Sequence, residues 1–219
     1  FGSVGLPLPG CEASLAEDGE ILVRGHHVMA GYHDAPEHTE AVLDDNGWLH
    51  TGDLGVLDAG FLSVVGRKKE LIITDGGKNV APAPIERTLR ELPEIAEAVV
   101  VGDRRPCLIA LITLDEEVLQ GRAQAAKLGC STYHDLVCHP EVRRWVAAAV
   151  DTANEGRTRA EQLRGFALLP APLSRAEGEL TATLKVRRRE VIERYAALVD
   201  ATYETAARRR DGEVADAEE

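Results

Sequence analysis

Glycine recurs at short intervals through the first 66 residues, and this spacing limits what that part of the chain can form. The glycines concerned are Gly10, Gly19, Gly25, Gly31, Gly47, Gly52, Gly55, Gly60 and Gly66. Glycine disfavours helix interiors and favours turns, so the apolar runs at 20–24 and 61–65 are predicted to be short strands. One short helix is expected at 35–43, where Pro36 suits the first turn. Residues 1–66 are therefore predicted to be β-rich.

The pattern changes to mixed helices and strands after residue 66. The predicted elements are a strand at 70–74, a turn at 75–77, a helix from Pro84, strands at 98–101 and 107–114, helices within 116–164, a strand at 165–169, a polar loop at 174–183 and an amphipathic helix at 186–210. The acidic residues from about 211 to 219 are predicted to be disordered. The predicted fold class is α+β, with a β-rich first part (1–66) and a small α+β domain with added helices (67–219).

Composition excludes several classes of protein. Hydrophobic residues make up 44% of the 219 residues and charged residues 28%, which is too apolar for a disordered chain. The net charge of −12 argues against nucleic acid as the main partner. No apolar run approaches the roughly 20 residues that span a bilayer, although peripheral membrane contact stays open. Four cysteines without a CxxC motif favour a reducing, cytoplasmic compartment.

Asp53 is the first candidate for chemistry. It stands between Gly52 and Gly55 in the segment GWLHTGDLG, where the backbone can approach a ligand closely. A carboxylate accepts two hydrogen bonds at once, which suits the neighbouring hydroxyls of a ribose. The alternative is an aspartate that caps a tight turn, and the spacing alone favours that structural role.

A second candidate region follows at the change of composition. Arg67, Lys68 and Lys69 are three consecutive cations that could bind phosphate or form a charged, solvated linker. The Gly76-Gly77 pair adds backbone without side chains, which fits either a hairpin or the wall of a narrow ligand channel.

Lys185 is the third candidate, in the segment GELTATLKVRR. The chain contains 20 arginines and only five lysines, and a lysine after a polar loop can reach into a site as a compact, mobile cation. The alternative is the basic start of a surface helix, which is electrostatically unfavourable without an anionic ligand or a nearby carboxylate.

A metal site is a weaker hypothesis. Cys130, His134 and Cys138 stand at i, i+4 and i+8 and would share one face of a helix, but their spacing matches no common structural zinc site. No metal ligand is therefore assigned. The chain also lacks both the GxxxxGK[ST] and the GxGxxG phosphate-binding patterns.

Taken in this order, the three segments resemble the C-terminal half of the acyl-adenylate-forming superfamily. The superfamily includes acyl-CoA synthetases, peptide-synthetase adenylation domains and luciferases. The segments FGSVGLPLPG, GRKKELIITDGGKNVAPAPIE and GELTATLKVRR are most similar to those of bacterial long-chain fatty-acid–CoA ligases, and the resemblance covers residues 1 to about 205.

The resemblance implies a role for each candidate residue. Asp53 would bind the ribose hydroxyls of ATP, Arg67 would contact the nucleotide, and Lys69 would be the hinge between the large domain and a mobile C-terminal lid. Gly76 and Gly77 would line the CoA channel, with the acidic Glu86 at the end of that motif. Lys185 would be the catalytic lysine. Ala182 departs from the family pattern, in which a proline is expected.

The implied activity is an ATP-dependent, AMP-forming ligation of a fatty acid to CoA. ATP and CoA would be substrates, with Mg²⁺ held by ligands outside this chain. The phosphate loop and the adenine-binding motif would precede Phe1, so the chain is predicted to be a fragment that is inactive without the missing N-terminal domain.

Two rival functions remain open. A fatty acyl-AMP ligase would stop at the adenylate, but such enzymes usually carry bulkier residues than Gly76 and Gly77. The second rival is a non-catalytic, separately expressed lid that binds another protein.

Overall fold

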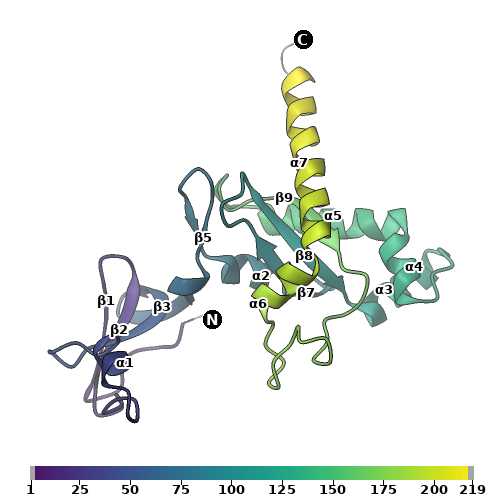
Figure 1. Cartoon of the computed structure of the whole chain (residues 1–219). Coiled ribbons are helices and arrows are strands. Elements are labelled where there is room, and N and C mark those ends of the chain that lie inside the picture. Colours follow the sequence, from purple (N-terminus) through teal and green to yellow (C-terminus); the bar gives the residue numbers. More distant parts are fainter. Residues whose placement is uncertain (1–2, 217–219) are drawn as a thin grey trace. The chain divides into compact units, whose positions relative to one another are not determined.

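The computed structural model describes residues 3–216, with side chains for residues 3–208 (Figure 1). The chain divides into two compact units, Phe1–Leu71 and Ile72–Glu219. Helices and separate sheets occur together, which confirms the predicted α+β class. The first unit extends past residue 66 because a short 3₁₀ helix, η1 (Lys68–Glu70), contacts its strand β3 (Leu49–Asp58).

The first unit is an antiparallel meander of four strands in the order β1-β2-β3-β4. Its elements besides β3 and η1 are β1 (Cys11–Leu15), β2 (Glu20–Gly25), α1 (Pro36–Glu40) and β4 (Phe61–Arg67). The strands predicted at 20–24 and 61–65 are confirmed. The helix predicted at 35–43 ends earlier, at Glu40, because Leu43 already pairs with Leu49 in a β-bridge.

The second unit contains a three-stranded sheet in the order β7-β8-β9 and a small hairpin. The sheet strands are β7 (Ile95–Val101), β8 (Leu108–Leu114) and β9 (Leu163–Leu168); the hairpin strands are β5 (Ile72–Ile73) and β6 (Asn79–Val80). Strand β8 runs antiparallel to β7 and parallel to β9. The strand predicted at 70–74 is shorter than expected, because Glu70 belongs to η1 and only Ile72 and Ile73 pair with β6.

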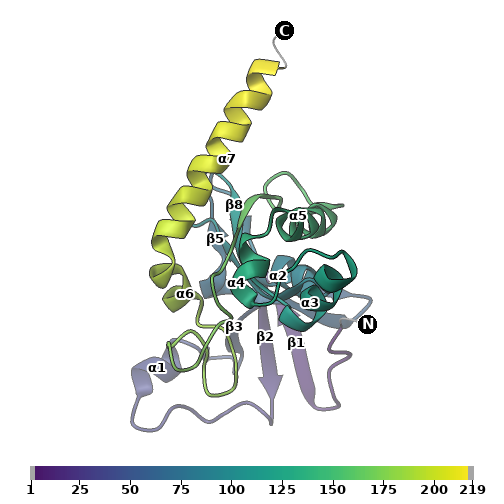
Figure 2. The same ribbon diagram turned by 90° about the vertical axis from the view of Figure 1, so that its right-hand side faces the viewer.

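Helices cover both faces of this sheet. They are α2 (Pro82–Arg90), α3 (Glu116–Ala125), α4 (Tyr133–Cys138), α5 (Pro140–Asn154), α6 (Arg188–Arg194) and α7 (Ala196–Asp216). Figure 2 shows α6 and α7 on one side of the sheet and α3, α4 and α5 on the other. Among the described residues, no helix is long and apolar enough to cross a membrane.

The end of the chain differs from the prediction in two ways. The helix expected at 186–210 is divided at Tyr195 into α6 and α7. Residues 211–216, predicted to be disordered, continue α7, since each residue added to an existing helix gains a hydrogen bond without a new nucleation step. Residues 217–219 lie outside the described residues.

Strand β8 explains why the second unit has two helical layers. All seven of its residues are buried. Successive strand side chains point to opposite faces; accordingly Leu108, Ala110 and Ile112 join the core shared with α2 to α5. The alternate residues Ile109 and Leu111 join a second core with Val199 and other residues of α6 and α7.

A capping box defines the start of α4. The Thr132 hydroxyl accepts a hydrogen bond from the Asp135 backbone N–H, and an Asp135 carboxylate oxygen accepts bonds from Thr132 N, Ser131 N and Ser131 Oγ at 2.9–3.0 Å. These hydrogen bonds, with the Ser131 backbone bond as the largest contribution, lower the pKa of Asp135 from 3.8 to about 2. The charged form of Asp135 therefore stabilises the fold.

We predict that acid removes this contribution. Because the folded-state pKa lies below the unfolded one, the stabilisation is complete above pH ~4 and is lost as the pH falls through about 2. Thr132→Ala should lower the free energy of unfolding by about 1 kcal/mol near neutral pH. Asp135→Asn should flatten the pH dependence between 4 and 2, measured by urea unfolding. The exposed Asp151→Asn is the matched control, and an equal flattening there would contradict the assignment.

Candidate functional site

The structure brings Asp53 and Arg67 together. They are directly opposite each other on β3 and β4, and Arg67 Nε donates to Asp53 Oδ1 at 2.9 Å. The Arg67 side chain is 66% exposed and that of Asp53 31%. Within the described part of the chain, Asp53 Oδ2 has no hydrogen-bond partner. The pair therefore offers a carboxylate oxygen and a guanidinium at the surface of the first unit.

Glycines beside Asp53 serve the local backbone. Gly52 has φ +72°, a conformation that favours glycine, and its N–H donates to Glu20 Oε1 at 2.9 Å. Gly55 lies against Ile21, and a Cβ added there would come within 2.6 Å of the Ile21 side chain. Both glycines are thus explained by the local backbone conformation and packing of β3.

A buried carboxylate holds the chain directly before the predicted hinge. Glu20 is 6% exposed, and Lys68 Nζ contacts its Oε2 at 3.1 Å and also pairs with Asp18. Burial raises the pKa of Glu20, but hydrogen bonds from Lys68, Gly52 and His50 outweigh it and lower the pKa. The same contacts, led by Asp18, raise the pKa of Lys68. Lys68 is therefore paired with two carboxylates of the first unit, whereas the neighbouring Lys69, which is also exposed, forms no ion pair among the described residues.

Gly76 and Gly77 form the tip of the β5–β6 hairpin. Gly77 has φ +70°, and Thr74 N–H donates to Lys78 O at 3.0 Å across the turn. A Cβ at either glycine would meet no atom within 4 Å, so open space adjoins both. Asp75 N–H donates to Arg105 O at 3.1 Å, which supports the hairpin from the loop between β7 and β8. The glycine pair is therefore an exposed tip on a supported hairpin.

Glu86 is a buried residue of the second unit. It lies on α2, is 6% exposed, and accepts a hydrogen bond from Val100 N at 2.7 Å. Arg188 donates to Glu86 Oε2 at 2.8 Å and to Val100 O at 2.8 Å. In this structure the Glu86 carboxylate therefore joins α2, β7 and α6.

Lys185 is exposed on a short hairpin between β9 and α6. Thr181 N–H donates to Lys185 O at 2.8 Å, and Lys185 N–H donates to Thr181 Oγ1 at 2.9 Å. Leu180 and Val186 pair in an antiparallel bridge, and Leu184 has φ +62°. The lysine is thus held by backbone contacts within the hairpin while its side chain is exposed.

The cysteine and histidine residues do not form a metal cluster in the described part of the chain. Cys138 Sγ lies 3.6 Å from His134 Nε2 on α4, but Cys130 precedes that helix and its thiol faces Leu128 O. The capping box at Ser131 and Thr132 starts the helix after Cys130, which breaks the i, i+4, i+8 arrangement assumed from the sequence.

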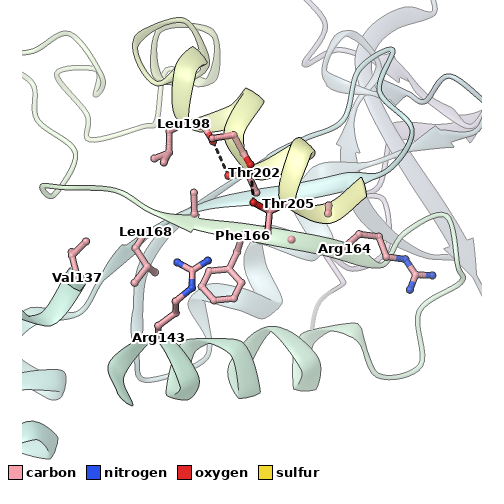
Figure 3. Close-up of a pocket in the computed structure, with 12 residues that line it drawn as sticks. Val137, Arg143, Arg164, Phe166, Leu168, Leu198, Thr202 and Thr205 are labelled. Atoms are coloured by element: carbon pink, nitrogen blue, oxygen red, sulfur yellow. Dashed lines mark hydrogen bonds between the residues drawn. The ribbon is translucent and has the colours of Figure 1, made fainter. Parts of the chain in front are cut away.

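A cavity of about 230 Å³ lies along β9 between α5 and α7 (Figure 3). Arg143 stacks over the Phe166 ring, with its guanidinium carbon 4.9 Å from the ring centroid. The Thr202 hydroxyl donates to Leu198 O and the Thr205 hydroxyl to Ala201 O. Since none of the predicted site residues lines this cavity, we assign no substrate to it.

Most of the second unit matches a known protein family. The family described as the AMP-binding enzyme C-terminal domain matches residues 69–207. The chain belongs to the AMP-binding enzymes. The matched range contains Lys69, Gly76, Gly77, Glu86 and Lys185, whereas Asp53 and Arg67 precede it.

Named relatives agree with this membership. Over 205 residues the chain is 46% identical to the long-chain-fatty-acid–CoA ligase FadD15 of Mycobacterium tuberculosis, covering 93% of this chain and 34% of that protein. The human long-chain-fatty-acid–CoA ligase ACSBG1 is 34% identical over 226 residues, covering 92% of this chain and 31% of its own length. The chain thus spans about a third of the length of these relatives.

Solved structures share the fold. The o-succinylbenzoate CoA synthetase MenE of Bacillus subtilis, in complex with AMP, matches with a TM-score of 0.62 and 29% identity over 86% of this chain and 35% of its own. The A-PCP didomain of a carboxylic acid reductase from Segniliparus rugosus matches with a TM-score of 0.72 and 21% identity, over 96% and 30% respectively, and supports the fold alone. AMP-binding enzymes thus supply both the sequence and the structural neighbours of this chain.

Sequence reasoning missed the residues that support the candidate site. Glu20 fixes Lys68, and Arg188 pairs with the buried Glu86. The basic residues around the start of α6 call for an anionic ligand or a nearby carboxylate, and Arg188 has a carboxylate partner in Glu86. No local pattern points to Glu20, whose partner is 48 residues away.

We predict that Asp53 and Glu86 differ sharply in their effect on stability. Asp53→Ala removes an exposed ion pair and should change the free energy of unfolding by less than about 1 kcal/mol. Glu86→Ala leaves Arg188 partly buried without its carboxylate and should cost about 3–5 kcal/mol. Urea unfolding followed by Trp48 in the first unit and Trp145 in the second separates the two effects. Equal losses would show that Asp53 is structural.

Proposed function

We propose that this chain is the C-terminal part of a long-chain fatty-acid–CoA ligase that activates a fatty carboxylate with ATP and transfers the acyl group to CoA. The observation that carries the proposal is the 46% identity to FadD15 over 93% of the chain, which spans all of the candidate residues. The exposed Asp53–Arg67 pair and the exposed Lys185 hairpin are consistent with groups that act on a ligand.

The first step forms an acyl adenylate. A carboxylate oxygen of the fatty acid bonds to the α-phosphorus of ATP, and the bond from that phosphorus to the bridging oxygen breaks, which releases pyrophosphate. Asp53 would accept hydrogen bonds from the ribose hydroxyls, and Arg67 would hold Asp53 in place while contacting the nucleotide. The Lys185 ammonium would stabilise the negative charge that develops on carboxylate and phosphate oxygens, an effect typically worth ~10²–10³ in rate.

The second step transfers the acyl group. The CoA sulfur, as thiolate after its proton has passed to solvent, attacks the acyl carbon, and AMP leaves with the bonding electron pair. The open space beside Gly76 and Gly77 would let the CoA arm pass close to the backbone at the tip of the β5–β6 hairpin. Mg²⁺ would neutralise charge on the triphosphate when bound. We assign it no residue of this chain.

A change of lid position between the two steps would use Lys69. Lys68 is tied to the first unit by Asp18 and Glu20, and the second unit starts at Ile72. The residues between these points, 69–71, are therefore the shortest segment about which the lid could turn.

Replacing Lys185 tests the assignment of the two steps. In the full-length enzyme, Lys185→Ala should slow adenylation by about 10²-fold or more, since the charge-stabilising cation is lost. Transfer from supplied acyl-AMP to CoA should change by less than about 3-fold. The exposed lysine variant Lys127→Ala is the control for loss of a surface cation. Equal losses in both half-reactions would show that Lys185 is structural, and adenylation without formation of acyl-CoA would instead favour an acyl-AMP ligase.

Replacing Lys69 tests the hinge. Lys69 lies in η1, and 3₁₀ helices keep φ near −50 to −70°, so proline fits the present conformation and resists others. Lys69→Pro should spare one half-reaction and slow the other by orders of magnitude. Lys69→Ala, which removes only the side chain, should spare both. Lys68→Pro tests the neighbouring position. If Lys69→Pro slows both half-reactions in proportion, or neither, residue 69 is not the pivot.

A further inference from the structure

The orientation of the Lys185 hairpin, residues 180–186, relative to the sheet is set by the residues at its base. It lies outside the helices and strands of the second unit, in the green segment that precedes α6 in Figure 1. Its internal contacts run from the bridge between Leu180 and Val186 to the hydrogen bonds between Thr181 and Lys185. These contacts set the shape of the hairpin, but they do not set where Lys185 points relative to the sheet.

Glu179 forms the base of the hairpin with both its backbone and its side chain. Its N–H donates to Ser174 O at 3.0 Å, and its C=O accepts a hydrogen bond from Arg187 N at 2.8 Å. Its Oε2 accepts a hydrogen bond from Ser174 N at 2.8 Å. Its Oε1 faces Arg194 Nε of α6 at 3.4 Å. One residue therefore connects the two ends of the hairpin to the preceding loop and to α6.

The cost of this arrangement suggests a role beyond stability. Glu179 is 2% exposed, and its Oε1 is buried without a hydrogen bond of good geometry. A buried carboxylate with an incompletely satisfied oxygen is an expensive way to hold a loop, and an apolar side chain of similar size often serves stability as well. A charged side chain also fixes the orientation of the loop, because the Arg194 guanidinium and the Ser174 N–H hold the Glu179 carboxylate from two sides.

The other end of the hairpin is held in the same manner. Arg188, three residues after Lys185, pairs with the buried Glu86 and donates to Val100 O of β7. Glu179 and Arg188 thus bracket the hairpin and connect it to the sheet and helices of the second unit. The hairpin is expected to move with that unit as one body.

We propose that Glu179 is a positioning residue, which directs Lys185 toward the reacting oxygens through the base of its hairpin. This inference rests on the proposed function of Lys185. Because Lys185 is needed only for adenylation, loss of Glu179 should slow that half-reaction alone. A residue that served only the stability of the lid would affect both half-reactions.

The test uses Glu179→Gln in the full-length enzyme, because glutamine keeps the shape and an oxygen for Ser174 N–H but removes the charge that faces Arg194. Adenylation should fall by about 10- to 100-fold, the order of loss expected from displacing a reacting group by about 1 Å. Transfer from supplied acyl-AMP should change by less than about 2-fold. Glu177→Gln is the matched control, since Glu177 also pairs with Arg194 but has a 53% exposed side chain; it should leave both rates unchanged.

A double variant shows whether Glu179 acts through Lys185. If it does, Glu179→Gln should cause no further loss of adenylation when added to Lys185→Ala. Proportional losses in both half-reactions, additive losses in the double variant, or an unchanged adenylation rate in Glu179→Gln would each overturn the proposal. If Lys185→Ala itself leaves adenylation intact, the proposed function of Lys185 fails instead, and that outcome is separate from the behaviour of Glu179→Gln.

Discussion

Strand β8 runs through the second unit with every residue buried, so the chain has to provide an apolar helical layer for each of its faces. Helices α2 to α5 supply one layer, and α6 with α7 supplies the other. The two layers come from segments far apart in the sequence, and the Glu86–Arg188 ion pair joins them through β7. The Lys185 hairpin precedes α6 directly, so its placement depends on the same packing.

The carboxylates discussed above differ in burial: Glu20, Glu86 and Glu179 are buried and support the fold, whereas Asp53 is partly exposed. Glu20, Glu86 and Glu179 are each less than 9% exposed and each contacts a cation together with a backbone N–H. Removing the partner of a buried charge lowers the free energy of unfolding strongly, so these ion pairs hold the segments that carry them together. Asp53 pairs with Arg67 at the surface, where an ion pair contributes little to stability.

The segment between the two units contains one lysine that is anchored by ion pairs and one that is not. Lys68 pairs with two carboxylates of the first unit, whereas Lys69 forms no ion pair among the described residues and lies two residues before the boundary at 71/72. An ion-paired residue next to an unpaired one would confine the proposed change of lid position to a few backbone positions. The sequence alone shows three similar cations at 67–69, and only the contacts distinguish Lys68, which is anchored, from its neighbour.

Local chemistry was sufficient to predict the α+β class, most strands and the turn at Gly76-Gly77, because glycine spacing, proline positions and apolar periodicity act within a few residues. Pairing across long separations was not predictable in this way. Glu86 and Arg188 are 102 residues apart, and Glu20 and Lys68 are 48 apart. Whether a charged residue becomes a buried anchor or an exposed group depends on the residues packed around it, and that packing is decided only when distant segments of the chain come together.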